Sequence, residues 1–522
     1  MKTPVPPLLQ DISQSAAVAT VEKHSYGQIL KSSVVIGGSS MVNILIGIVR
    51  TKAMAVLLEP AGFGLMGVYG SIANLAQSIA GMGINSSGVR QIAEAVGSGE
   101  TERIARTAVV LKRTSVLLGI VGAVSLVAFS RHVSTLTFGD DQHATAVALL
   151  SLAVFFSLIS GGQGALIQGM RRIADLARMG ILGSFFGLLI SIPLVYFLRE
   201  EGVVPSLIGI AAMTMITSWW YSRKVQISTP AMTTYQVRNE AAALLKLGFA
   251  FMASGFLTLG AAYAVRIMVL RLEGLEAAGY YQAAWTLGGL YVGFILQAMG
   301  ADFYPRLTAV AKDNAVCNRL VNEQAQISLL LAGPGVIATL TFASVAITLF
   351  YSEKFGAAVE VLRWICLGTI LQVITWPMGY IIVAKGEQKI FFWAEVAWTI
   401  VNISLSWICL ISFGLNGAGI AFFGSYVFHW LLIYLIVQRI SGFRWAGTNR
   451  KTRLIFLSLI AVVFCSFYVL QPIWAIGIGT LAVVLSSVYS IRVFLNLISL
   501  DQIPHPIKEL LVRFNVTRSG SI

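Results

Sequence analysis

About 14 apolar runs follow one another along this chain, and most are long enough to cross a bilayer as a helix. A hydrocarbon core about 30 Å thick needs about 20 apolar residues in a helix. The composition agrees, because 57% of the 522 residues are hydrophobic and only 11% are charged, whereas soluble domains average about 25% charged residues. In lipid, each backbone N–H and C=O must be satisfied within its own helix. The sequence therefore predicts an all-α polytopic membrane protein with about 14 transmembrane helices.

The predicted spans are separated by short polar segments, and residues 1–28 are polar, without the short apolar region of a signal peptide. Two spans, 115–129 and 206–221, are short, and the first is long enough to be tilted. The spans are 30–58, 65–84, 115–129, 145–168, 181–198, 206–221, 244–270, 280–299, 327–350, 359–384, 390–413, 417–437, 454–470 and 473–491.

Positive charge is distributed unevenly between the two sides of the predicted membrane region. The N-terminal segment and alternate loops after it contain 29 of the 37 lysines and arginines, whereas the opposite loops contain only Arg131, Arg199 and Lys354. Cytoplasmic loops are enriched in Lys and Arg. We therefore expect a multi-pass protein of the bacterial inner membrane with both termini cytoplasmic. The net charge of +14 reflects this topology, so no nucleic-acid partner is expected.

The two halves of the chain resemble each other weakly but in the same order. Residues 61–64 match 278–281, residues 135–138 match 347–350, and residues 207–211 match 418–421, at offsets of 217, 212 and 210. This predicts two parallel-repeat six-helix lobes around a central cavity, as in several secondary transporters. The predicted parts are a cytoplasmic N-terminal tail (1–28), an N-lobe (29–221), a cytoplasmic linker (222–243), a C-lobe (244–440), two extra helices (441–492) and a cytoplasmic C-terminal tail (493–522).

Charged residues within the spans are the candidate functional groups, because each costs about 2.5–3.5 kcal/mol on insertion scales. Arg50 and Lys52 lie late in the first span, and Arg266 lies 216 positions after Arg50 in the seventh. Such residues would suit an anionic group such as a pyrophosphate, since Arg offers a planar fork and Lys a point charge. Alternatively, they extend toward the outer interface. Arg271 and Arg363, at span ends, are expected to be interfacial anchors with little functional effect.

Acidic and neutral polar residues give a second set of candidates. Asp302 and Glu395, near cytoplasmic span ends, could carry a coupling proton or could be interfacial charges, and His429 is expected to be hydrogen-bonded within the bundle. Several glutamines could meet sugar hydroxyls or join neighbouring helices. These are Gln77, Gln163, Gln168, Gln282, Gln297 and Gln372.

Catalytic and metal-binding patterns do not stand out in the sequence. The four cysteines lack metal-ligand spacing and are interpreted as small hydrophobic residues. There is no Walker A motif, no Ser-His-Asp arrangement and no large outer loop. We therefore expect no cofactor, no metal and no enzymatic activity.

Two stretches of the chain resemble polysaccharide flippases of the Wzx type, in the multidrug/oligosaccharidyl-lipid/polysaccharide exporter superfamily. The first comprises LKSSVVIGG and RTKAMAVLLEPAGFGLMGVYGSIANLAQSIAGMGI, and the second is YSEKFGAAVEVLRWICLGTILQVITWPMGYIIVAKGEQKIFFWAEV. The resemblance covers about residues 28–440 and is strongest to flippases of O-antigen and enterobacterial common antigen lipid intermediates. Many of those have 12 spans, so the last two spans here are additional.

The resemblance implies alternating access for a polyprenyl-pyrophosphate-linked oligosaccharide, with membrane lipids around the carrier chain and cationic residues in a central cavity. Lys52 matches a basic first-span residue of the family. The polymerase and chain-length proteins of the same pathway are the implied protein partners. The alternatives are a peptidoglycan-precursor flippase, a drug/cation antiporter of the same superfamily and a membrane glycosyl polymerase or ligase. The antiporter would be expected to have acidic residues within spans 1 and 7, and the polymerase or ligase a large outer loop.

The charge asymmetry predicts which loops face outward. Cysteines introduced at Asp140 and Glu353 should react with a membrane-impermeant reagent applied from the outside of intact cells, because both lie in the lysine- and arginine-poor loops. Labelling of Asp140→Cys only from the cytoplasmic side would reverse the predicted orientation.

Overall fold

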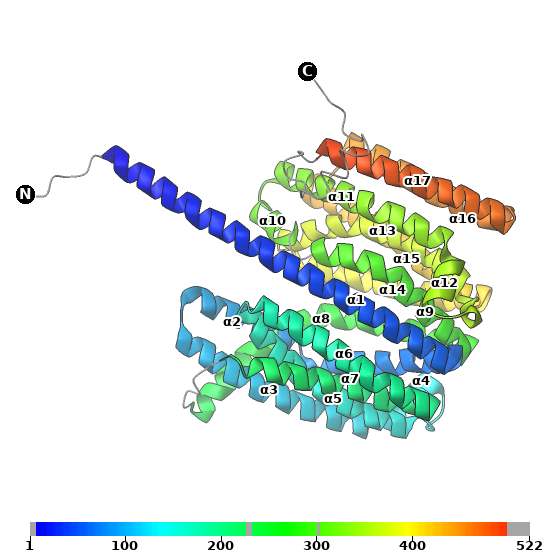
Figure 1. Ribbon diagram of the computed structural model, residues 1–522, viewed down its shortest axis with the longest axis horizontal. Helices are drawn as coiled ribbons and strands as arrows, with labels where there is room; N and C mark the ends of the chain where they lie inside the picture. The colour runs from blue at the N-terminus through cyan, green and yellow to red at the C-terminus, as the bar shows by residue number, and fades with distance from the viewer. Residues whose placement is uncertain (1–6, 226–231, 300–302, 498–522) are drawn as a thin grey trace, which may run out of the picture. The chain divides into compact units, whose positions relative to one another are not determined.

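Helices form the regular structure of this chain. The computed structural model describes residues 7–225, 232–299 and 303–497, and within them there is no β-strand (Figure 1). This confirms the all-α polytopic prediction. The elements are α1 (Pro7–Gly81), α2 (Ile84–Ser98), α3 (Thr101–Ala128), α4 (Ser130–Phe138), α5 (Ala144–Gly169), α6 (Ile173–Leu198), η1 (Arg199–Gly202), α7 (Val203–Ser222), α8 (Thr234–Glu273), α9 (Leu275–Ala298), α10 (Tyr304–Ala309), α11 (Asn314–Thr341), α12 (Ala343–Phe350), η3 (Glu353–Phe355), α13 (Ala358–Ala384), α14 (Gln388–Phe413), α15 (Asn416–Ser441), α16 (Gly447–Val469) and α17 (Pro472–Leu497).

Every predicted span overlaps a helix in the described part of the chain. Eleven helical stretches there are long and apolar enough to cross a membrane. Two of them, Gly38–Gly81 and Ile173–Ser222, each overlap two predicted spans. The eleven stretches therefore account for 13 of the 14 predicted spans. The remaining predicted span, 280–299, lies on α9.

Two predicted spans have different limits in the structure. The segment predicted as one span at 327–350 is divided, because α11 ends at Thr341 and α12 is a separate short helix. Both α3 and α11 also begin well before the predicted starts. Their N-terminal parts carry Glu–Arg pairs at helical spacing, Glu102 with Arg106 and Glu323 with Arg319. Such pairs support helix in contact with water, so these helices continue beyond their apolar parts.

The first two predicted spans both lie mainly in α1, which is interrupted at a single residue between them. Glu59 has φ 58° and ψ −176°, and Pro60 follows it. Proline provides no backbone N–H and clashes with the preceding turn, so the helix breaks there and restarts in a new direction. The Glu59 carboxylate accepts a hydrogen bond from Lys354 Nζ at 2.6 Å. Both side chains are exposed, so this ion pair adds little stability.

The chain forms two compact units. Unit 1 comprises Met1–Leu57, Ile72–Leu136 and Asp140–Phe256, and unit 2 comprises Leu58–Ser71, Thr137–Gly139 and Leu257–Ile522. Both α1 and α8 therefore contribute residues to both units. The lobe limits predicted from the sequence, 29–221 and 244–440, were drawn differently from these units, and the two lobes stay a prediction.

The same order of helix pairing occurs in each unit. In unit 1, α5 packs against α3 and α7, and α6 packs against α7; in unit 2, α13 packs against α11 and α15, and α14 packs against α15. The turn before the last helix of each set also recurs. Arg199 has φ 53° and ψ −128°, and Gly414, 215 positions later, has φ 59° and ψ −146°. These matching pairings and turns are what an internal repeat produces.

The structure corrects the register of the repeat. A side chain at Gly64 would meet the carbonyl of Leu275, and one at Gly279 would meet the carbonyl of Pro60. Gly64 and Gly279 are 215 positions apart, and so are Pro60 and Leu275, so the two contacts are reciprocal. Reciprocal contacts arise where two related segments meet about a local twofold axis. The offset here is therefore 215, rather than the 217 that the sequence match suggested.

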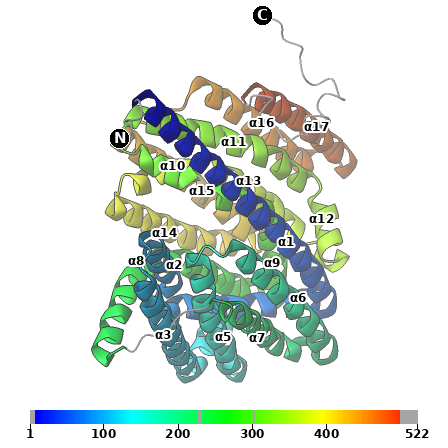
Figure 2. The ribbon, with the colours of Figure 1, turned by 60° about the vertical axis from the view of Figure 1, so that its left-hand side comes forward.

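The two extra helices, α16 and α17, form a pair that packs against α11 (Figures 1 and 2). A side chain at Gly333 of α11 would meet the Phe456 ring, and one at Gly479 of α17 would meet Thr341. Close approach of helices at small residues is the usual way in which helices associate in a membrane. The extra helices are thus packed tightly against α11 within unit 2.

We expect Gly279→Ala to destabilise the protein, because the new methyl group would clash with the backbone carbonyl of Pro60. Overpacking of this kind costs about 1–3 kcal/mol. Gly289→Ala on the same helix is the matched control, since no atom lies within 4 Å of its new methyl group. The measurement is the thermal unfolding midpoint of the detergent-solubilised protein, and equal midpoints for the two variants would contradict the close contact.

Candidate functional site

Arg266 of α8 is held by neutral partners in unit 2. Its Nε donates a hydrogen bond to Gln282 Oε1 of α9 at 3.0 Å, and its Nη1 donates to the carbonyl of Ala262 at 3.2 Å. A guanidinium carries five N–H donors, and these two bonds use only two of them. The side chain is therefore fixed in orientation and still has donors to offer to a ligand.

Aromatic and amide side chains of α9 surround this arginine. The Arg266 guanidinium lies 5.9 Å from the centre of the Trp285 ring, which also packs against Tyr281 at 6.0 Å. Gln282 Nε2 donates to Thr286 Oγ1 at 3.0 Å. We call Arg266, Tyr281, Gln282, Trp285 and Thr286 the Arg266 cluster. Charged donors, an amide and an indole together are suited to a ligand that combines anionic and hydroxyl groups.

The sequence indicated only part of this cluster. Arg266 and Gln282 were candidates, whereas Tyr281 and Trp285 were not singled out. The available signal was the run YYQAAW, in which Tyr281 and Trp285 are four residues apart and so lie on one face of α9. Gln163, another candidate glutamine, accepts a hydrogen bond from Ser218 and so joins α5 to α7.

The positive charge of Arg266 has no carboxylate partner. In the described part of the chain, neither Arg266 nor Arg50 lies within ion-pair distance of Asp or Glu, although other arginines, such as Arg172 with Asp175, do. A charge in the bilayer interior normally pairs or faces a water-filled cavity. Arg266 therefore stays a candidate for binding an anionic group.

Arg50 and Lys52 lie on α1 in unit 1, and both side chains are half-buried. Arg50 is nine residues before the break at Glu59, and Arg266 is eight residues before Gly274, whose φ is 90°. With the offset of 215, Arg50 corresponds to Val265 rather than to Arg266. A difference of one residue turns a side chain by about 100° around a helix. Arg266 therefore lies one position beyond the residue that corresponds to Arg50.

Of the two acidic candidates, Asp302 and Glu395, only Glu395 lies in the described part of the chain. Asp302 lies outside the described residues. Glu395 lies in the eighth position of α14, and its Oε1 is 3.7 Å from Nε2 of His429 on α15. The prediction that His429 is hydrogen-bonded within the bundle is wrong, because neither ring nitrogen has a hydrogen-bond partner although the residue is only 7% exposed.

The two arginines expected to be interfacial anchors are instead engaged within unit 2. Arg271 Nε donates to the carbonyl of Thr137 at 3.1 Å. Arg363 is 8% exposed, pairs with Glu360 and lies 3.7 Å from the centre of the Phe467 ring of α16. Glu360 also accepts a hydrogen bond from Tyr468 at 2.8 Å. Arg363 therefore helps to attach α16 to α13.

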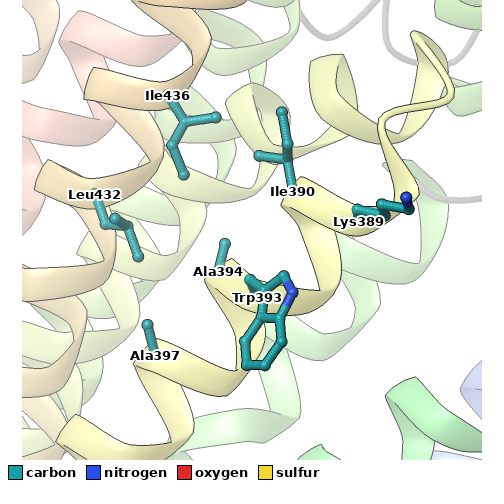
Figure 3. A pocket seen from close by; sticks show the side chains of 7 residues that line it. All are labelled: Lys389, Ile390, Trp393, Ala394, Ala397, Leu432 and Ile436. Carbon is teal, nitrogen blue, oxygen red and sulfur yellow. The ribbon is translucent and has the colours of Figure 1, made fainter.

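An open apolar groove lies along α14 and α15 (Figure 3). Lys389 stands at one end of it, and the Trp393 ring lies beside Ala394. The other lining residues are aliphatic, so the groove offers one charge and otherwise only apolar surface. It is lined by Lys389, Ile390, Trp393, Ala394, Ala397, Leu432 and Ile436.

Comparison with known proteins identifies the family. The sequence profile of a family described as "Polysaccharide biosynthesis protein" matches residues 53–360, more than half of the chain. The chain belongs to this family. It is also similar to the lipid III flippase of Escherichia coli (strain K12), with 23% identity over 420 residues that cover 78% of this chain and 99% of the relative. The resemblance to polysaccharide flippases is thus confirmed at the level of the family.

Solved structures show the same fold in related transporters. A lipid II flippase MurJ in an inward closed conformation matches with a TM-score of 0.65 and 14% identity, covering 88% of this chain and 98% of that one. An inward-facing MATE family multidrug transporter matches with a TM-score of 0.64 and 17% identity, covering 78% and 98%. Lipid flippases and drug exporters share this fold, so it does not by itself decide the substrate.

We expect Arg363→Ala to lower stability, contrary to the expectation from its place at a span end. The substitution leaves Glu360 without its cation and removes the contact with Phe467, which should cost about 1–3 kcal/mol. The measurement is the thermal unfolding midpoint in detergent, with the exposed Arg131→Ala as control. A midpoint equal to that of the control would show that Arg363 does not attach α16.

Proposed function

We propose that this protein is a flippase that moves a polyprenyl-pyrophosphate-linked oligosaccharide from the cytoplasmic to the periplasmic leaflet of the bacterial inner membrane. The product would serve surface polysaccharide biosynthesis, as an O-antigen-like or common-antigen-like unit. The name of the E. coli relative and the family match support this substrate class. The polymerase and chain-length proteins of such a pathway are the proposed recipients of the flipped product.

The observation that carries the proposal is the charge of Arg266, which has only neutral protein partners. A phosphate in hydrocarbon is very costly unless it is hydrogen-bonded and neutralised. Arg266 can supply a planar pair of donors to phosphate oxygens, while Gln282 and Trp285 offer an amide and a ring face to sugar. Arg50 and Lys52 are proposed to add positive charge from the first span.

We propose that the two predicted lobes, 29–221 and 244–440, rock between inward-open and outward-open states with both termini in the cytoplasm. The headgroup would enter a cavity between the lobes while the polyprenyl chain stays in lipid. An inside-negative potential favours outward movement of an anion by about 2.3 kcal/mol per charge per 100 mV. The protein would act as a transporter and perform no covalent step.

Peptidoglycan-precursor flippase activity is the second candidate, since the lipid II flippase MurJ has a similar fold. A drug/cation antiporter is less well supported, because its cationic substrates would be repelled by Arg266. Complementation separates these functions, since each predicts rescue of a different deficient strain.

We expect Arg50→Ala and Arg266→Ala each to reduce export of surface polysaccharide by more than about tenfold, because each removes charge-assisted bonds worth about 1.5–3 kcal/mol. Arg266→Lys should restore part of the activity, since Lys cannot form the planar fork. The measurement is complementation of a strain that lacks its common-antigen or O-antigen flippase, with membrane expression checked by blot.

Arg90→Ala is the control, because Arg90 forms an exposed pair with Glu94. Full complementation by the Arg50→Ala/Arg266→Ala double variant at normal expression would show that these arginines do not bind substrate. Rescue only of a strain that lacks its peptidoglycan-precursor flippase would support the second candidate.

A further inference from the structure

Glu395, which is half-buried, and the buried His429 form a titratable pair outside the Arg266 cluster. Glu395 lies on α14 and His429 on α15, two helices that pack against each other in unit 2. His429 Nε2 and Glu395 Oε1 are 3.7 Å apart. This distance is too long for a hydrogen bond but short enough for strong attraction once the imidazole is protonated. Protonation of the imidazole would thus allow a closer, ionic contact between these two side chains.

Among the described residues, those around His429 are aromatic and provide it with no other partner. The Trp398 and Tyr426 rings lie 5.6 Å and 5.9 Å from the imidazole, and neither imidazole nitrogen is hydrogen-bonded. The Tyr426 hydroxyl is engaged by the Trp376 side chain of α13. Buried polar groups are almost always hydrogen-bonded, and an exception needs an explanation.

Proton binding provides that explanation. A neutral imidazole beside a carboxylate leaves one negative charge in a site of low dielectric constant. Adding one proton makes the pair neutral overall and allows Nε2 to donate a hydrogen bond to Oε1. The site therefore has two protonation states with different charge and different attraction between α14 and α15, which is what a proton-coupled movement requires.

We propose that Glu395 and His429 are the proton-binding site that couples flipping to the transmembrane proton gradient. This proposal rests on the proposed flippase function and adds the coupling ion and its site. In each cycle the pair takes one proton from the outer solution and releases one to the cytoplasm as the headgroup moves outward. No covalent bond other than the bond to the proton is made or broken.

The other charged groups on the packed helices are placed away from this pair or engaged elsewhere. On α13, Arg363 and Glu360 pair with each other near the opposite end of the helix, and Lys385 donates to Asn314 and to the carbonyl of Ala311. Lys389 of α14 stands at the groove shown in Figure 3.

On α16, Arg453 lies 4.5 Å from the centre of the Trp445 ring and 5.8 Å from that of the Trp430 ring of α15. In the described residues, neither Arg453 nor Lys389 is within ion-pair distance of Glu395. His429 is thus the cation nearest to this carboxylate when the imidazole is protonated.

A proton fits this site better than a metal cation. Na⁺ and related hard cations take several oxygen ligands. Within the residues that the structure describes, no group of three or more His, Cys, Asp and Glu side chains could hold a metal ion. One imidazole next to one carboxylate can instead bind a single proton.

The coupling test uses the full-length protein in liposomes with a polyprenyl-pyrophosphate oligosaccharide as probe. We expect a pH gradient, acidic outside, to accelerate flipping by the unaltered protein. Glu395→Gln and His429→Gln should flip without a gradient but lose the acceleration. Glu387→Gln, on an exposed residue just before α14, and His132→Gln, on an exposed outer residue, should keep it. Flipping that only a Na⁺ gradient accelerates, or that no gradient accelerates, would overturn the proton site and leave the flippase function standing.

A second measurement does not depend on flipping. Histidine labelled with ¹⁵N can be titrated by NMR in the purified protein from about pH 5 to about pH 9, the range in which imidazole changes charge. His429→Gln identifies the His429 signal among the five histidines. We expect the pH dependence of the His429 signal to differ in Glu395→Gln and to be unchanged in Glu387→Gln. A His429 signal whose pH dependence Glu395→Gln leaves unchanged would overturn the proposal whether or not the protein flips this lipid.

Discussion

The bilayer interior allows a charged side chain only where something compensates the charge, and this constraint connects the separate features of this protein. Exposed arginines near the membrane surfaces pair with carboxylates, and the buried Arg363 pairs with Glu360. Arg266 differs, since its hydrogen bonds go to an amide and a backbone carbonyl. If an anion binds here, as proposed, it would offset the cost of this charge and stabilise the site.

Close backbone packing gives the moving parts of such a transporter defined positions. The reciprocal contacts of Gly64 with Leu275 and of Gly279 with Pro60 leave no room for a side chain. Glu59, beside them, has a backbone conformation that residues other than glycine rarely adopt. Gln282 of the Arg266 cluster packs against Gly67, its counterpart at the offset of 215. The candidate substrate site and the local twofold contact therefore share α9.

Hydropathy was sufficient to predict most of the long helices, because spans of about 20 apolar residues are imposed by the membrane. It also singled out Arg266 and Glu395, since charges within such spans are conspicuous. It could not give the repeat register, which depends on which glycines meet backbone carbonyls, nor the pairing of Arg363 with Glu360 beneath Phe467. His429 was misjudged because the sequence does not reveal that neither imidazole nitrogen has a partner. These features depend on contacts between segments that are far apart in the sequence, and the periodicity of hydrophobic residues does not predict such contacts.

The central claim is that negative charge on the lipid carrier is what the protein recognises. It is tested most directly by comparing two probes in liposomes containing the purified protein: an oligosaccharide on a polyprenyl pyrophosphate, and the same oligosaccharide on an uncharged polyprenyl ether. Transfer to the opposite leaflet is measured by the accessibility of the sugar to a lectin added outside. The account predicts rapid transfer of the pyrophosphate probe, little transfer of the ether, and no competition between them. Equal transfer of both probes, or strong competition by the ether, would contradict it.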